Sequence, residues 1–124
     1  MQKGRVIGVG GVFLKSKDQA GLTSWYSDKL GIEPVFKWRS FEDPGVELLT
    51  AWSVFEADSN YFEPSTAPFM INYIVDDLDA ILTKLSASGV RIDPKRENYD
   101  YGRFGWIFDP DGNKIELWEP VTPS

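Results

Sequence analysis

An internal repeat constrains the fold of this 124-residue chain more strongly than any other feature of its sequence. Asp18 and Leu22 recur 59 residues later as Asp77 and Ile81. In each copy a short apolar run precedes the aspartate, and a glycine and a further apolar run follow it. A unit of this size buries too little apolar surface to be secure alone, so the two copies are expected to share one domain.

An amphipathic helix is predicted in the middle of each copy. In the first copy, apolar residues follow the spacing of one helical face: Leu22, Trp25, Tyr26 and Leu30. The second copy repeats this spacing with Leu78, Ile81, Leu82 and Leu85. Asp18 and Asp77 are the predicted N-caps of these helices, and Gly31 and Gly89 are their predicted C-terminal ends.

Strands are predicted before and after both helices. Those that follow the helices are expected at residues 32–39, 46–50 and 51–56, with a turn at 42–45, and at 90–96, 103–108 and 114–119, with a turn at 109–113. Each copy is then a β-α-β-β-β module. We expect a single α+β domain over residues 1–124, with module 1 over about 6–59, a linker over about 60–68 and module 2 over about 69–120.

Composition excludes several classes of function. The chain has no histidine and no cysteine, which excludes a Ser-His-Asp triad, disulfides, thiolate nucleophiles and metal sites built on these residues. Its net charge of −6 argues against nucleic acid as a partner. No apolar run approaches the roughly 18 residues of a membrane span, and no signal segment follows the N-terminus. We therefore expect a cytoplasmic protein without a membrane partner.

Three motifs resemble the vicinal oxygen chelate superfamily, which includes glyoxalase I, extradiol dioxygenases and bleomycin-resistance proteins. They are Trp25-Tyr26 with Leu30-Gly31-Ile32, then Ile74-Val75-Asp76-Asp77-Leu78, and the most specific one, Asp-Pro-Asp-Gly-Asn-Lys-Ile-Glu-Leu-Trp-Glu-Pro at 109–120. The resemblance extends over about residues 6–120. It implies an incomplete mixed β-barrel that encloses a cleft, with the helices outside, and it implies a homodimer.

The resemblance also locates the positions where metal-using members hold their ligands. Gly11 and Met70 stand where those members usually have histidines, and neither is a suitable ligand for the divalent ions involved. Glu116 retains the fourth ligand position, and Glu56 is the nearest candidate for the remaining one. We therefore expect no metal and no other cofactor.

Glu116 is the candidate catalytic residue. The alternation along residues 114–118 predicts that Ile115 and Leu117 face a helix, while Glu116 and Trp118 line the concave side of the sheet. Glu116 is then a general base, a ligand-binding acid, or a structural residue satisfied by a Tyr hydroxyl, an Arg or a water. Arg103 is a candidate cation for Glu116 or for an anionic ligand, or else part of a solvated hairpin tip.

The other candidates for ligand binding share aromatic or polar side chains on the predicted strands and the loop before residue 103: Phe13, Trp52, Phe55, Asn72, Tyr101, Arg103, Trp106 and Trp118. Each single aromatic residue also fits a role in core packing. Together they exceed what two short helices need to bury, which favours an aromatic pocket.

Three functions are compatible with these features. The first is a metal-free binder of a small aromatic or cationic molecule, because an acidic chain with an aromatic cleft suits a cation. The second is a lyase, an isomerase or a dioxygenase-like enzyme, metal-free or weakly metal-dependent, with Glu116 as base or ligand. The third is a divergent domain that has lost its tight ligand.

Overall fold

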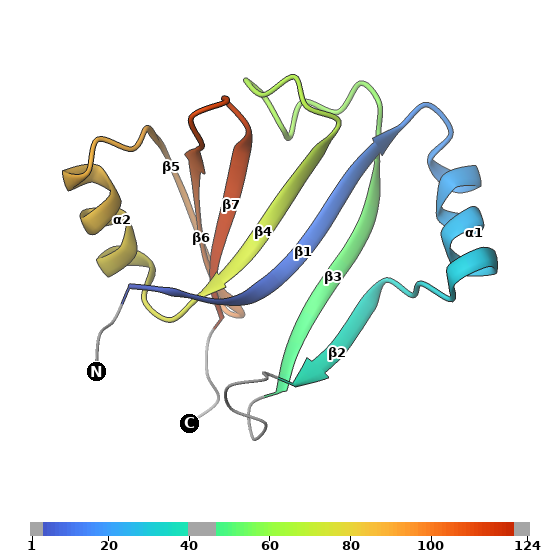
Figure 1. Ribbon diagram of the computed structural model, residues 1–124, viewed down its shortest axis with the longest axis horizontal. Coiled ribbons are helices and arrows are strands. Elements are labelled where there is room, and N and C mark those ends of the chain that lie inside the picture. The colour runs from blue at the N-terminus through green and yellow to red at the C-terminus, as the bar shows by residue number, and fades with distance from the viewer. Residues whose placement is uncertain (1–3, 40–46, 121–124) are drawn as a thin grey trace.

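The computed structural model describes residues 4–39 and 47–120, which form one mixed sheet and two helices (Figure 1). The elements in chain order are β1 (Val6–Ser16), α1 (Gln19–Leu30), β2 (Val35–Arg39), β3 (Glu47–Glu56), β4 (Phe69–Val75), α2 (Leu78–Ala87), β5 (Ile92–Tyr99), β6 (Gly102–Phe108) and β7 (Lys114–Pro120). The predicted α+β fold is confirmed. Within the described residues, no helix is both long and apolar enough to cross a bilayer.

The two copies of the repeat lie side by side in a single sheet of order β2-β3-β1-β4-β7-β6-β5. In each copy the first strand pairs in parallel with the last one, β1 with β3 and β4 with β7. The antiparallel pair of β1 and β4 joins the two copies at the centre of the sheet. The repeat in the sequence is therefore a repeat of topology.

Module 1 differs from its prediction in one element. The segments 46–50 and 51–56, expected as two strands, form the single strand β3 over Glu47–Glu56. No turn residue separates Thr50 from Ala51, and buried residues alternate with more exposed ones along the whole strand. Module 1 is therefore β-α-β-β over the described residues, and the predicted turn at 42–45 lies outside them.

Both helices begin at the predicted aspartates. The side chains of Asp18 and Asp77 accept hydrogen bonds from the backbone N–H groups of Gly21 and Ala80, at 3.0 Å in each case. Gly31 ends α1 in the left-handed conformation, with φ of 67°. Each cap satisfies backbone groups that a helix end leaves without intrahelical partners.

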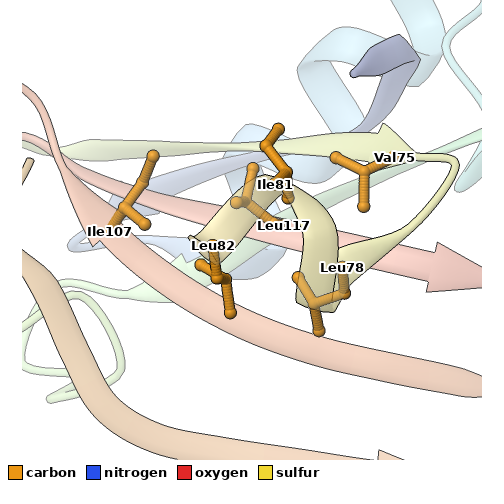
Figure 2. Packing of buried hydrophobic residues seen from close by; sticks show 6 residues of the cluster. All are labelled: Val75, Leu78, Ile81, Leu82, Ile107 and Leu117. Carbon is orange, nitrogen blue, oxygen red and sulfur yellow. The ribbon is translucent and has the colours of Figure 1, made fainter. Parts of the chain in front are cut away.

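Helix α2 covers the outer face of module 2 and forms its core. Its buried residues pack with residues of β4, β6 and β7 in one apolar cluster (Figure 2): Val75, Leu78, Ile81, Leu82, Ile107 and Leu117. Ile115 packs against the same cluster, as the alternation along β7 predicts. The side chains at positions 116 and 118 then face the opposite side of the sheet, which we call the inner face.

Helix α1 is only partly embedded. None of its residues is buried, and Trp25 and Leu30 are 50% and 59% exposed. Tyr26 packs on Trp52, with ring centroids 4.7 Å apart. The described part of module 1 has one strand fewer than module 2, so α1 lies over a narrower part of the sheet. The predicted apolar face of this helix is therefore about half exposed to solvent.

The inner face carries a second, aromatic cluster. Its buried centre is Phe62, Met70 and Trp106, and the half-buried residues packed against it are Phe13, Phe55, Tyr61 and Phe104. Tyr61 and Phe62 belong to the linker between the modules, so this linker folds back onto the inner face. The linker thereby fills part of the concave side on which the cleft was expected.

Candidate functional site

A buried carboxylate lies at the centre of the inner face. Glu116 is only 3% exposed, and its two carboxylate oxygens accept three hydrogen bonds. Asn72 donates from Nδ2 to Oε1 at 2.6 Å, Trp106 donates from Nε1 to Oε2 at 3.0 Å, and the Tyr61 hydroxyl donates to Oε2. Among the alternatives open from the sequence, the structure shows Glu116 satisfied by a Tyr hydroxyl together with an amide and an indole.

The register of the sheet places two of these three donors. Asn72 on β4 and Trp106 on β6 are the direct cross-strand partners of Glu116 on β7. Directly opposed residues point to the same face of a sheet and lie close enough for their side chains to interact. Tyr61 is the exception, because it reaches Glu116 from the linker.

All three donors to Glu116 are neutral, and Glu116 makes no ion pair with any described residue. Burial, and then the nearby Glu116 carboxylate, raise the pKa of the Tyr61 hydroxyl well above its usual range, so Tyr61 stays a donor at neutral pH. The nearby Lys114 donates instead to the backbone oxygen of Tyr61, at 3.0 Å. Burial lowers the pKa of Lys114.

Gly10 on β1 allows the close approach of Asn72. The Oδ1 atom of Asn72 is buried and accepts no hydrogen bond from the described residues. A Cβ atom at Gly10 would lie 2.3 Å from this oxygen and 2.8 Å from Ile74. The absence of a side chain at position 10 is therefore required for Asn72 to present its amide nitrogen to Glu116.

An aromatic pocket opens beside this carboxylate. It has a volume of about 310 Å³ and is lined by Tyr61, Glu97, Tyr99, Tyr101 and Phe104. The rings of Tyr99 and Tyr101 are stacked with centroids 5.1 Å apart, and Phe104 meets both of them nearly edge-on. Tyr61 lines the pocket and also binds Glu116, so it connects the two parts of the site.

The carboxylate in the aromatic pocket already has partners. Glu97 pairs with Lys95 at 3.4 Å, with side chains 28% and 59% exposed respectively. Hydrogen bonding to Glu97 raises the pKa of the Tyr99 hydroxyl. Lys95 also lies 5.5 Å from the centroid of the Trp106 ring. Glu97 thus places one negative charge in the pocket, and the ion pair with Lys95 at the rim partly neutralises it.

The structure places six of the predicted binding residues on the inner face. Asn72 and Trp106 bind Glu116, Tyr101 lines the aromatic pocket, and Trp118 stacks behind Phe104 with centroids 6.0 Å apart. The other two pack in the aromatic cluster: Phe13 and Phe55.

Two candidates lie on the outer face instead. Trp52 is buried beneath Tyr26 of α1, because the uninterrupted alternation of β3 puts it on the face opposite Phe55. Arg103 binds Asp79 at 2.9 Å and Glu119 at 2.6 Å, on the side covered by α2. Arg103 therefore does not supply a cation to Glu116.

The residues at the four metal-ligand positions of the superfamily that this sequence resembles do not suit a metal ion. Met70 is fully buried in the aromatic cluster, and Gly11 has no side chain to offer. Glu56 is exposed at the end of β3, on the other face of this strand from Phe55. Over residues 4–39 and 47–120, no three Asp, Glu, His or Cys residues are grouped as a metal would need.

Three residues of the site were not among the candidates predicted from the sequence: Tyr61, Glu97 and Tyr99. Tyr61 lies in a proline-containing linker that has no periodicity to indicate a facing. Glu97 and Tyr99 lie beyond residue 96, where the strand was expected to end, whereas β5 extends to Tyr99. At even spacing on this strand, both face the same side of the sheet. Glu97 pairs directly with Phe104 on β6.

The fold and the sequence together define the class of protein. A family model described as Glyoxalase/Bleomycin resistance protein/Dioxygenase superfamily matches residues 9–117, and the chain belongs to this family. No curated protein matches the sequence.

Solved structures with the same fold include two methylmalonyl-CoA epimerases. The enzyme from Mycobacterium tuberculosis is 21% identical with a TM-score of 0.63, over 98% of this chain and 93% of that one. A variant of the Streptomyces coelicolor enzyme in complex with 2-nitronate-propionyl-CoA is 14% identical with a TM-score of 0.68, over 95% and 100%. A Legionella pneumophila structure described as NAD-dependent benzaldehyde dehydrogenase is 15% identical with a TM-score of 0.57, over 90% and 98%.

Proposed function

We propose that this chain is a metal-free binder of a small cationic molecule, which it holds in the aromatic pocket. One observation carries the proposal: four aromatic side chains and the carboxylate of Glu97 line one open pocket of about 310 Å³. This volume is at the lower end of the range for small-molecule sites, which indicates a compact ligand.

The chemistry of the lining favours positive charge. The faces of aromatic rings are electronegative, and a cation within about 6 Å of a ring centroid gains roughly 0.5–2 kcal/mol, depending on how far it is desolvated. Glu97 adds a negative charge at the same place. The net charge of −6 attracts cations to the chain from a distance.

The alternative is an enzyme, a lyase or isomerase that uses Glu116 as its base. The position of Tyr61 favours it, because this residue connects the pocket to the carboxylate and holds a proton between them. The burial of Glu116 weighs against it, since both oxygens already accept hydrogen bonds. A substrate would have to displace Tyr61 before it could deliver a proton to Glu116.

A charged ligand and its neutral isostere test the binding function. Choline and 3,3-dimethyl-1-butanol have nearly the same shape, and only choline is charged. In an NMR titration of the backbone amides, we expect choline to bind about tenfold more tightly, with shifts centred on the aromatic pocket. Equal affinities for the two compounds would refute the proposal.

Variants locate the site and separate the two functions. Tyr101→Leu is expected to weaken choline binding about three- to tenfold by removing one ring, whereas Trp25→Leu, a matched change of an exposed aromatic residue on α1, is expected to leave it unchanged. The enzyme alternative is tested with methylmalonyl-CoA in D₂O. Exchange of the α-proton that disappears in Glu116→Gln while ligand affinity is retained would favour the enzyme.

A further inference from the structure

We propose that two copies of this chain pair edge to edge through strand β2, so that their sheets join across a two-fold axis at Val35. The proposal concerns a surface of module 1 and does not depend on the ligand of the aromatic pocket. It follows from an open strand edge, from the exposed apolar residues near it and from the charges along it.

Strand β2 ends the sheet on the side of module 1 (Figure 1). It corresponds to β6 of module 2, because each of the two pairs antiparallel with the last strand of its module. The other edge of β6 pairs with β5, whereas no strand among the described residues pairs with the other edge of β2. Module 1 therefore has an open edge at the position that β5 covers in module 2.

The backbone of β2 can pair with a further strand on this side. Trp52 donates its backbone N–H to the carbonyl oxygen of Pro34 at 2.8 Å, so residues 34 and 52 form a hydrogen-bonded pair of the antiparallel ladder. Since such pairs alternate along the ladder, the N–H and C=O groups of Val35 and Lys37 point away from β3. Pro34, which has no N–H, is turned toward β3 and removes no donor from the outer edge.

Exposed apolar residues are concentrated in the elements around this edge. Trp25 and Leu30 on α1 are 50% and 59% exposed, Val35 on β2 is 51% exposed, and Leu49 on β3 is 41% exposed. In module 2, Ile92 of β5 packs against the apolar cluster that α2 forms. The described residues give α1 no strand of this kind. Apolar surface left in solvent in one region is typical of a surface that binds another protein.

The charges along β2 identify that protein as a second copy. Glu33 and Lys37 are exposed, stand two residues on either side of Val35, and make no ion pair with any described residue. In an antiparallel pair centred on Val35, this valine lies opposite its own copy. Glu33 then lies opposite the partner's Lys37 on both sides of the axis. Opposite charges that face each other across two strands stabilise the pair, and like charges destabilise it.

This register also explains how an edge lysine can be compatible with association. A lysine on an edge strand opposes pairing with other strands when it meets no opposite charge. A register centred on Lys37 would place two lysines directly opposite each other. The register centred on Val35 gives each lysine a carboxylate instead. Because a two-fold axis brings the same residues from both copies together, the spacing of Glu33 and Lys37 about Val35 makes the edge complementary to itself.

Charge reversals at residues 33 and 37 test both the interface and its register. Sedimentation of the parent protein should show twice the chain mass of 14.0 kDa. Glu33→Lys alone and Lys37→Glu alone each replace two attractive pairs with two repulsive ones, and we expect each to weaken dimerisation about tenfold. Lys84→Glu, the same reversal at an exposed position on α2, is expected to leave dimerisation unchanged. Circular dichroism checks that each variant remains folded.

Mixing the two single variants distinguishes this interface from any other. One variant has lysines at both positions and the other has glutamates, so an equimolar mixture is expected to form heterodimers about as tight as the parent dimer. The double variant, Glu33→Lys with Lys37→Glu, should restore the homodimer in the same way. A parent protein that is monomeric at micromolar concentration would overturn the proposal. A dimer that neither reversal weakens, or weakened variants that mixing does not rescue, would equally exclude pairing through β2 in this register.

Discussion

Removal of the Tyr61 hydroxyl tests whether the hydrogen bonds around Glu116 stabilise the fold. Tyr61→Phe keeps the ring, which stacks on Phe55 with centroids 5.5 Å apart, and it deletes the donor to a carboxylate that is 3% exposed. The other two donors, Asn72 and Trp106, stay in place. The variant therefore isolates one of three hydrogen bonds on a buried charge.

The expected loss follows from the kind of hydrogen bond. A hydrogen bond to a charged group contributes about 1.5–3 kcal/mol, and we expect the free energy of unfolding to fall by about that amount. For a domain of this length each kcal/mol corresponds to roughly 3–6 °C, so the melting temperature is expected to fall by about 5–15 °C. Tyr73→Phe is the matched control, because the Tyr73 ring packs in the α2 core and its hydroxyl has no hydrogen-bond partner among the described residues.

Urea unfolding followed by tryptophan fluorescence measures both variants, and a double-mutant cycle with Glu116→Gln identifies the partner. In the Glu116→Gln background the hydrogen bond is between neutral groups, so the cost of Tyr61→Phe should shrink to about 0.5–1.5 kcal/mol. Equal stability of Tyr61→Phe and the parent protein, within about 0.5 kcal/mol, would show that the hydroxyl is not bound to a buried carboxylate.

Four other results are expected. Gly10→Ala should destabilise the protein by about 1–3 kcal/mol in urea unfolding, because its Cβ would overlap Asn72; an unchanged midpoint contradicts this packing. Hydrogen bonds from Arg96 and then Arg103 hold the pKa of Asp79 below its usual value, so Asp79 stabilises the fold above about pH 4 and this contribution is lost as the pH falls through the lowered pKa. Melting temperatures of Asp79→Asn and the parent should then differ at pH 7, and the difference should shrink as the pH falls below about 4; a constant difference would assign the effect to packing. Elemental analysis after dialysis should find no stoichiometric zinc, nickel, iron or manganese, since the chain has no histidine or cysteine, and one bound equivalent would overturn this. Sedimentation should show a homodimer that Trp25→Ser and Leu30→Ser weaken, whereas 14.0 kDa for the parent at micromolar concentration would exclude it.

Local patterns in the sequence were enough to predict most of the fold. The N-caps Asp18 and Asp77 depend on hydrogen bonds within one helical turn, and the turn before β7 depends on Asp109, which accepts from the backbone N–H groups of Asp111 and Asn113 at 2.9 Å. The side chain of Glu116 was placed on the inner face by alternation alone. Such features involve neighbours in the chain, so the sequence carries them directly.

Local patterns did not decide which face of the sheet every strand residue occupies. Whether residues 46–56 form one strand or two changes no local propensity. Trp52 and Phe55 face opposite sides on either reading, and only the packing of α1 on Trp52 decided which of the two lies on the outer face. Arg103 could be taken for a cleft residue because both of its partners are distant in the sequence. Glu119 is its cross-strand partner on β7, and Asp79 reaches it from α2.

The site itself was decided by tertiary structure. Asn72 and Trp106 reach Glu116 because the register aligns three strands, and Tyr61 reaches it because a linker without periodicity folds over the inner face. The sequence determined that a carboxylate would face this side of the sheet. Only the packing of distant segments decided which groups satisfy it and which rings enclose the pocket beside it, because hydrogen bonds to a buried group depend on distances in space that no spacing along the chain encodes.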